Sequence, residues 1–367
     1  MIRNAKELAE ACDALRAGGV AALDTEFVWR CTYRPCLALV QMGTKDGTCW
    51  AEDCLQGLDP APLAGILRDS GVVKILHDAK QDLDHLFHYT GAKPVNVFDT
   101  QLAAAFAGFP AGLSLQKLLT ETAGITLPKT ETVTDWMQRP LTDAQMRYAL
   151  DDVRYLGEAR ESLVERARGL GTLAWMEEEM RIYDDPSRYG RDDADEQWKR
   201  VKCGGVHLDR RGFAMLRALA ETRERLAREW NLPKTWLADD ASLAAMAAGG
   251  PMESGRLRFR HRLRSGGQRT RLAAAYAAAL AEGAAVPDEE CPPDPRPHYL
   301  SEVKAAAEDA LAFLRERAEE VHVDPAVIAT RATVTAWVDN PYDDSNPLAG
   351  GWRNEVVGRD IAERFQV

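Results

Sequence analysis

The sequence predicts an α/β domain followed by two all-helical regions. Short apolar runs alternate with helical patterns over the first 110 residues, whereas helical periodicity dominates from residue 207 onward. Two stretches rich in polar residues or proline, 184–204 and 284–298, interrupt the pattern. The 367 residues also exceed the size at which single hydrophobic cores usually stop growing, so we expect more than one folded domain.

The first domain is expected to contain a mixed sheet, because closely spaced early strands favour hairpins. Apolar and β-branched residues predict strands at 20–23, 37–42, 48–51, 72–76 and 95–98. Helical patterns follow at 82–89, 101–107, 114–123 and 142–168. Asp99 is the expected N-cap of the helix that starts near residue 101.

The helical regions have their own boundary signals. Residues 213–230 predict an amphipathic helix that ends at Asn231-Leu232-Pro233, because proline disfavours continuation of a helix. Residues 299–367 are again expected to be helical, with a break near Pro341.

Composition narrows the functional classes. The apolar runs are shorter than the roughly 20 residues needed to cross a bilayer, and the N-terminus lacks the apolar core of a secretion signal, so we expect a cytoplasmic protein without a membrane segment. The seven cysteines are scattered without a C-x-x-C pair, which argues against a zinc cluster or a disulfide framework. The net charge of −11 is unfavourable for nucleic-acid binding, but residues 205–286 contain 14 basic and 8 acidic residues.

Acidic residues follow the first predicted strand, in the motif Leu23-Asp24-Thr25-Glu26-Phe27. Side chains alternate along a strand, so Asp24 and Glu26 are expected on one face, about 7 Å apart. Two anions at this separation repel each other unless a cation lies between them. Alone, the motif is more typical of a solvated strand end than of a metal site.

Two further acidic motifs lie at predicted helices. Asp82 precedes Leu83 at a strand-to-helix transition, where Asp78 and Asp84 are rival ligands and all three also suit the positive end of a helix. Tyr148 and Asp152 are four residues apart and therefore share a helix face. Asp151 is the rival carboxylate there, and a half-buried tyrosine on an acidic helix is the alternative interpretation.

Together these residues suggest one chemistry. Oxygen ligands without cysteine or histidine suit Mg²⁺ or Mn²⁺. Two such ions about 3.5 to 4 Å apart can stabilise the attacking and leaving oxygens of an in-line phosphodiester displacement. A nearby phenol can orient the attacking water and take its proton.

The chain resembles the ribonuclease D family, which belongs to the tyrosine subclass of the DEDD exonucleases. The first motif is followed by Tyr33, Pro35 and Leu39-Val40-Gln41. The second includes His77 and Asp82-Leu83, with Val97-Phe98-Asp99-Thr100-Gln101 after it. The third spans Leu127, Lys129, Asp135-Trp136, Arg139-Pro140-Leu141, Gln145, Tyr148-Ala149, Asp152-Val153 and Tyr155-Leu156. Asp78 and Asp151 depart from the family, which often has small residues at those places.

The resemblance implies a ribonuclease H-like α/β fold and a 3′-5′ exoribonuclease that binds two divalent metal ions and no small-molecule cofactor. Asp24 would bridge both ions, Glu26 and Asp152 would complete one site, and Asp82 would hold the second ion. Tyr148 would orient or deprotonate water, while Thr25, Phe27 and His77 would contact substrate. The implied substrates are single-stranded 3′ ends of structured RNA, such as tRNA precursors, and the products nucleoside 5′-monophosphates. A DNA-directed exonuclease and a catalytically silent RNA-binding protein are the alternatives.

The helical regions resemble HRDC domains, which are nucleic-acid-binding modules. The match includes residues 219–243 and, more weakly, Ile328-Ala329-Thr330-Arg331 with Gly351-Trp352-Arg353. The expected division is an exonuclease domain at 1–170, a linker at 171–204, a first HRDC domain at 205–283, a proline-rich linker at 284–298 and a second HRDC-like domain at 299–367.

Basic residues suggest where RNA would be held. Seven arginines lie within residues 256–271, and those that alternate with other residues are Arg256, Arg258, Arg260, Arg262 and Arg264. Guanidinium groups pair with phosphates and stack on bases, although a solvated helix face paired with the acidic residues of 287–320 is an equal alternative. Lys129 and Arg139 are further candidates for backbone contacts, with salt bridges inside their loop as the alternative.

Overall fold

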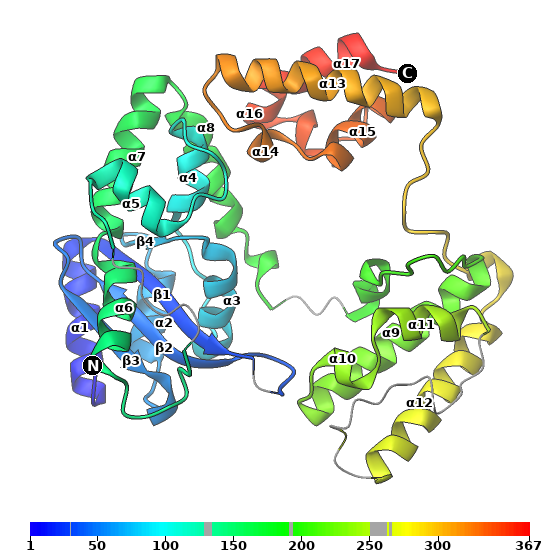
Figure 1. Ribbon diagram of the computed structural model, residues 1–367, viewed down its shortest axis with the longest axis horizontal. Helices are drawn as coiled ribbons and strands as arrows, with labels where there is room; N and C mark the ends of the chain where they lie inside the picture. The colour runs from blue at the N-terminus through cyan, green and yellow to red at the C-terminus, as the bar shows by residue number, and fades with distance from the viewer. Residues whose placement is uncertain (30, 128–133, 191–193, 250–262, 264–265) are drawn as a thin grey trace. The chain divides into compact units, whose positions relative to one another are not determined.

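The computed structural model describes residues 1–29, 31–127, 134–190, 194–249, 263 and 266–367 (Figure 1). The chain divides into two compact units. Unit 1 is made of residues 1–28, 37–190 and 299–367, and unit 2 of residues 29–36 and 191–298. The expected α/β architecture lies in unit 1.

A five-stranded mixed sheet with the order β3-β2-β1-β4-β5 forms the centre of unit 1 (Figure 1). Its strands are β1 (Val20–Val28), β2 (Cys36–Gly43), β3 (Cys49–Asp53), β4 (Val73–Leu76) and β5 (Val97–Asp99). β1 pairs in parallel with β4, and β4 with β5, whereas β2 and β3 are antiparallel. β1 continues to Val28 instead of ending at Leu23, so the first acidic motif lies inside the strand. Strand pairing outweighs the low strand propensity of its acidic residues.

Helices surround this sheet. They are α1 (Ala5–Gly18), α2 (Ala61–Arg68), α3 (Ala79–Thr90), α4 (Thr100–Phe106), α5 (Leu115–Ala123), α6 (Asp143–Arg154), α7 (Leu156–Leu170) and α8 (Leu173–Met180). The single helix expected at 142–168 is two helices, because α6 ends at Arg154 and the backbone of the next residue, Tyr155, leaves the helical conformation. The predicted N-cap is confirmed, since Asp99 accepts hydrogen bonds from the backbone N–H groups of Gln101 and Leu102.

Asp99 also fixes the start of α3. Its carboxylate accepts hydrogen bonds of 3.0 Å from the backbone N–H groups of Asp78 and Ala79. The helix therefore begins at Ala79, earlier than the expected Asp82. This cap comes from a distant strand, so local sequence signals do not reveal it.

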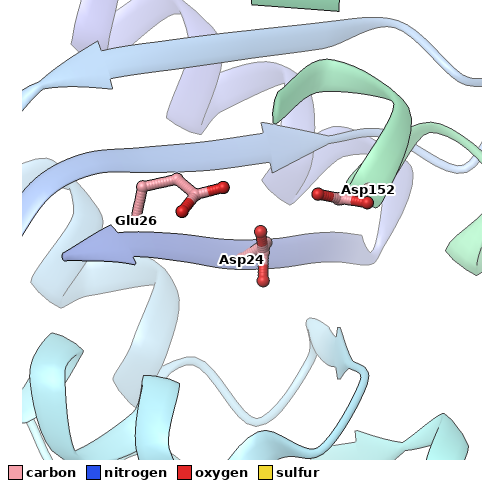
Figure 2. A group of neighbouring side chains, drawn as sticks. All are labelled: Asp24, Glu26 and Asp152. Carbon is pink, nitrogen blue, oxygen red and sulfur yellow. The ribbon is translucent and has the colours of Figure 1, made fainter. Parts of the chain in front are cut away.

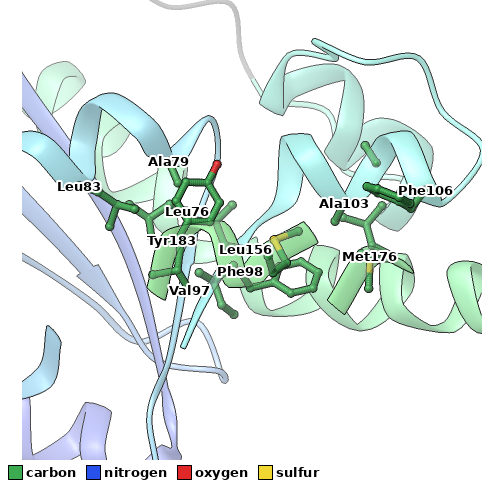
Figure 3. Packing of buried hydrophobic residues seen from close by; sticks show 14 of the residues in the cluster. Leu76, Ala79, Leu83, Val97, Phe98, Ala103, Phe106, Leu156, Met176 and Tyr183 are labelled. Carbon is green, nitrogen blue, oxygen red and sulfur yellow. The ribbon is translucent and has the colours of Figure 1, made fainter. Parts of the chain in front are cut away.

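Residues 171–190, expected to be part of a linker, belong to the core of unit 1. Met176, Met180, Tyr183 and Tyr189 are all buried there. Figure 3 shows Met176 and Tyr183 among side chains from β4, β5, α4 and α7. In the sequence these four anchors are separated by charged and polar residues, which gave the segment the character of a linker.

The C-terminal helices pack on the α/β part of unit 1. They are α13 (Ser301–Glu320), α14 (Pro325–Ile328), α15 (Arg331–Asp339), α16 (Gly351–Arg353) and α17 (Arg359–Phe365), with a π-helix at Asn354–Gly358. The break expected near Pro341 follows the end of α15. Glu179 on α8 accepts hydrogen bonds from the Arg353 guanidinium at 2.8 Å and from the Trp352 indole at 2.9 Å. The Trp352 ring also meets Phe106 edge-on.

Unit 2 is built around helices α9 (Arg210–Trp230), α10 (Lys234–Leu237), α11 (Asp240–Ala247) and α12 (Gly266–Ala285). The predicted end of α9 is confirmed, because Asn231 adopts the left-handed conformation that terminates a helix. Trp198, Val201 and Cys203, also expected in a linker, are buried in the core of this unit. Cys291, in the proline-rich stretch, is buried as well.

In the part of the chain that the structure describes, every helix is too short or too polar to cross a membrane.

Candidate active site

Three carboxylates from two elements converge on one face of the sheet (Figure 2). Asp24 and Glu26 are two residues apart on β1 and so share one face of the strand, and Asp152 lies on α6. One oxygen atom from each carboxylate lies within 4.8 Å of the other two. The start of α6 is fixed by a capping box between Thr142 and Gln145, which sets the position of Asp152 three turns later.

Burial and mutual repulsion make this cluster electrostatically costly. Burial, followed by the charge of Asp152, raises the pKa of Asp24 to about 8. Burial and the charges of Asp24, Asp152 and Asp82 raise the pKa of Glu26 to about 9. The pKa of Asp152 is raised to about 7, chiefly by burial and then by Asp151. A cation between these groups would favour their ionised forms.

Tyr148 lies one turn before Asp152 on the same face of α6. Its phenol and the Asp152 carboxylate form a hydrogen bond. Burial, followed by the charges of Asp152, Glu26 and Asp24, raises the pKa of Tyr148. The ring lies 6.1 Å from that of Trp136, which supports it from the loop before α6. The hydroxyl therefore points toward the carboxylate cluster.

Asp82 lies in the first turn of α3 and is separate from the three-carboxylate group. Its carboxylate accepts a hydrogen bond from the Thr25 hydroxyl of β1. Burial, followed by the charge of Asp24, raises the pKa of Asp82 well above the usual range of an aspartate. Asp24 therefore interacts electrostatically with both Asp152 and Asp82.

The rival carboxylates have other surroundings. Asp151 forms an ion pair of 3.0 Å with Arg154. Asp84 lies 3.4 Å from the His88 ring nitrogen. Asp78 is exposed and adopts a left-handed backbone conformation at the start of α3, with φ of 61°. None of the three belongs to the carboxylate group found among the described residues.

The predicted substrate contacts are only partly described. Thr25 is buried and bonded to Asp82, while the Phe27 ring is half-buried on β1. His77 lies at the end of β4, with its Nδ1 atom 2.9 Å from the Thr100 hydroxyl. Lys129, Arg256, Arg258, Arg260, Arg262 and Arg264 lie outside the described residues.

Arg139 has the alternative role that the sequence left open. Its guanidinium donates two hydrogen bonds of 2.7 Å to the Asp53 carboxylate. It also donates to the backbone oxygens of Trp136, Gln138 and Ala38. Arg139 therefore anchors the loop before α6 to the sheet.

Two residues near the site had no predicted role there, although Gln41 belongs to a motif that carries the family resemblance. The His85 ring on α3 lies 4.1 Å from the Phe27 ring, and its Nδ1 atom is 3.3 Å from the Thr25 hydroxyl. Its three-residue spacing from Asp82, one helical turn, was an available signal. Gln41 is fully buried on β2, and a glutamine inside the apolar run 37–42 was the corresponding signal.

Comparisons with known proteins find similarity to 3′-5′ exonucleases. A family described as 3′-5′ exonuclease matches residues 1–167. The ribonuclease D of Desulfotalea psychrophila is 34% identical over 91% of this chain and 90% of its own, and that of Acidiphilium cryptum is 33% identical over 98% and 91%. The crystal structure of Escherichia coli RNase D, described as an exoribonuclease involved in structured RNA processing, has a TM-score of 0.85 and 29% identity over 99% of this chain and 97% of that one.

The catalytic core of RRP6 from Trypanosoma brucei shares the fold, with a TM-score of 0.58 and 22% identity over 78% of this chain and 80% of that one. The similarity to the two ribonuclease D relatives extends over at least nine-tenths of each chain, and it includes the exonuclease domain with its partly buried carboxylates. The chain therefore belongs to the ribonuclease D family of hydrolytic 3′-5′ exoribonucleases.

Proposed function

We propose that this chain trims the 3′ ends of structured RNA, such as tRNA precursors, by a two-metal hydrolysis that releases nucleoside 5′-monophosphates. The observation that carries the proposal is the convergence of Asp24, Glu26 and Asp152 within 4.8 Å, beside Tyr148. The description of the E. coli relative supports structured RNA as the substrate class.

The donor set fits divalent cations. Three carboxylates lie close together and repel one another when ionised, and a bound cation would reduce this repulsion. Ligand sets made only of oxygen atoms suit Mg²⁺ or Mn²⁺. In this proposal Asp24, Glu26 and Asp152 hold one ion, and Asp24 and Asp82 hold the second. When bound, the ions would activate water and stabilise the leaving 3′-oxygen.

The side chains around the carboxylates would orient the reactants. Tyr148 would position the attacking water through its hydroxyl and help to remove its proton. Thr25 would fix the rotamer of Asp82 by the hydrogen bond that its hydroxyl donates. Phe27 and His77 are proposed to contact the terminal nucleotides.

RNA outside the active site would be held by helical regions. We assign residues 205–283 and 299–367 to HRDC-type domains, with the exonuclease domain at 1–170 extended by the buried segment up to residue 190. Lys129 and the arginines at 256–264 are proposed to bind the RNA backbone, since they are basic in an otherwise acidic chain.

A nuclease assay tests this function directly. A tRNA precursor with a 3′ extension, labelled at its 5′ end, is incubated with the full chain and Mg²⁺ or Mn²⁺, alongside the Asp24→Asn variant. We expect stepwise shortening and nucleoside 5′-monophosphates with the wild type only. A DNA strand of matched sequence is the specificity control. Faster loss of DNA would favour a DNA-directed exonuclease, and binding of RNA without cleavage by both proteins would favour a silent binding protein.

A further inference from the structure

The β1–β2 hairpin places Gln41 opposite Asp24. The two strands are neighbours joined by residues 29–35, a connection too short for the dozen or so residues of a parallel crossover, so they run antiparallel. A Cβ atom built on Gly43 would lie 3.4 Å from the Ala22 Cβ, which means that these two residues face each other. Asp24 follows Ala22 by two residues on β1, and Gln41 precedes Gly43 by two residues on β2. In an antiparallel pair Asp24 therefore faces Gln41.

The Gln41 side chain lies on the α6 side of the sheet. A Cβ atom on Gly43 would also lie 3.2 Å from the Val153 backbone oxygen of α6. Leu39 packs in one cluster with Ala149 of the same helix. Because alternate residues of a strand share a face, Gln41 points between these two contacts and beneath α6, beside the carboxylate cluster.

The Gln41 carboxamide is buried without a protein partner. Its exposed fraction is 0%, and among the described residues neither Nε2 nor Oε1 has a hydrogen-bond partner. Such a group is destabilising, and the neighbouring Leu39 shows that an apolar side chain fits this face. We therefore expect the Gln41 amide to find a hydrogen-bond partner when cations are bound at the site.

We propose that Gln41 is a positioning residue for the cation site, donating a hydrogen bond from Nε2 to the Asp24 carboxylate. This inference rests on the proposed function. The hydrogen bond would fix the orientation of the Asp24 carboxylate for its proposed ligand role, as outer partners of metal ligands do.

The Gln41→Met variant tests this role, because methionine keeps the length of the side chain but offers no N–H donor. Mn²⁺ binding to the purified full chain is followed by electron paramagnetic resonance of the free ion. We expect Mn²⁺ to bind about 10- to 100-fold more weakly. We also expect an equal or higher melting temperature in EDTA, since an unpartnered amide has been removed. If Gln41 only filled space, the substitution would not lower Mn²⁺ affinity while leaving the melting temperature unchanged or higher.

The matched control is Val40→Ala, on the opposite face of β2 and in the main core of unit 1. It should lower the melting temperature while Mn²⁺ affinity stays within about 2-fold of the wild type. Wild-type affinity in Gln41→Met, or an equal loss of affinity in Val40→Ala, overturns the role of Gln41. Asp24→Asn in the same titration tests the proposed function separately. If that variant binds Mn²⁺ like the wild type, the cation site itself is misplaced.

Discussion

Replacing Asp24 with asparagine should stabilise the cation-free protein while abolishing its activity. The pKa of Asp24 is raised to about 8 in the folded chain, from an ordinary value of 3.8. Below pH 3.8 both folded and unfolded chains are protonated, so the group costs nothing. As the pH rises from there to about 8, the unfolded chain ionises first, and folding stability falls.

The magnitude follows from the size of that pKa difference. Each pKa unit corresponds to about 1.36 kcal/mol, which sets an upper limit of roughly 5–6 kcal/mol for this group. Asparagine is itself polar, and Glu26 and Asp152 still repel each other, so only part of this free energy is recovered. We expect a gain of about 2–3 kcal/mol, equivalent to a rise in melting temperature of roughly 4–12 °C.

Thermal unfolding of wild type and Asp24→Asn measures this gain. In EDTA at pH 8 the variant should melt at the higher temperature, and the difference should shrink toward pH 4.5. Mn²⁺ should then narrow or close the difference in melting temperature between the two proteins. A concentration of 100 times the dissociation constant stabilises the wild type by about 2.7 kcal/mol, whereas the variant lacks a ligand and gains less.

Two outcomes would refute this reasoning. If Asp24→Asn melts below the wild type in EDTA at pH 8, the carboxylate is not under electrostatic strain in the folded protein. If Mn²⁺ raises the melting temperature of both proteins equally, the cation binds somewhere other than at Asp24.

Three further substitutions probe the site and its supports. Tyr148→Phe should lower the single-turnover cleavage rate by about 10²- to 10⁴-fold and leave Mn²⁺ affinity unchanged; a rate within 2-fold or so of wild type would exclude catalysis by the phenol. Arg353→Ala leaves the Glu179 carboxylate without its ion pair, so calorimetry should show that the free energy of unfolding falls by about 2–4 kcal/mol. An unchanged melting temperature would contradict the role of Arg353 in anchoring the C-terminal helices to α8. Gly283→Ala would place a Cβ atom 2.5 Å from the Met215 Cα, so denaturant unfolding should show that the free energy of unfolding falls by about 1–3 kcal/mol. An unchanged free energy of unfolding would mean that α9 and α12 can move apart without cost.

Local periodicity made parts of the site predictable. The four-residue spacing of Tyr148 and Asp152 placed both on one helix face, and strand alternation placed Asp24 and Glu26 together. The buried segment 173–189 was mistaken for a linker, because its four core anchors are spread among polar residues. Composition describes a segment's average character, whereas a few well-placed side chains decide whether it joins a core.

By itself the sequence determined the α/β class, the strand positions and the acidic motifs, since these depend on residues close together in the chain. Only the tertiary structure decided which residues that are distant in the sequence come into contact. Asp99 caps α3 from a distant strand, Arg139 pairs with Asp53, and Gln41 lies opposite Asp24 through the register of a hairpin. These contacts depend on strand order and helix packing, which join residues whose separation along the chain carries no periodic signal.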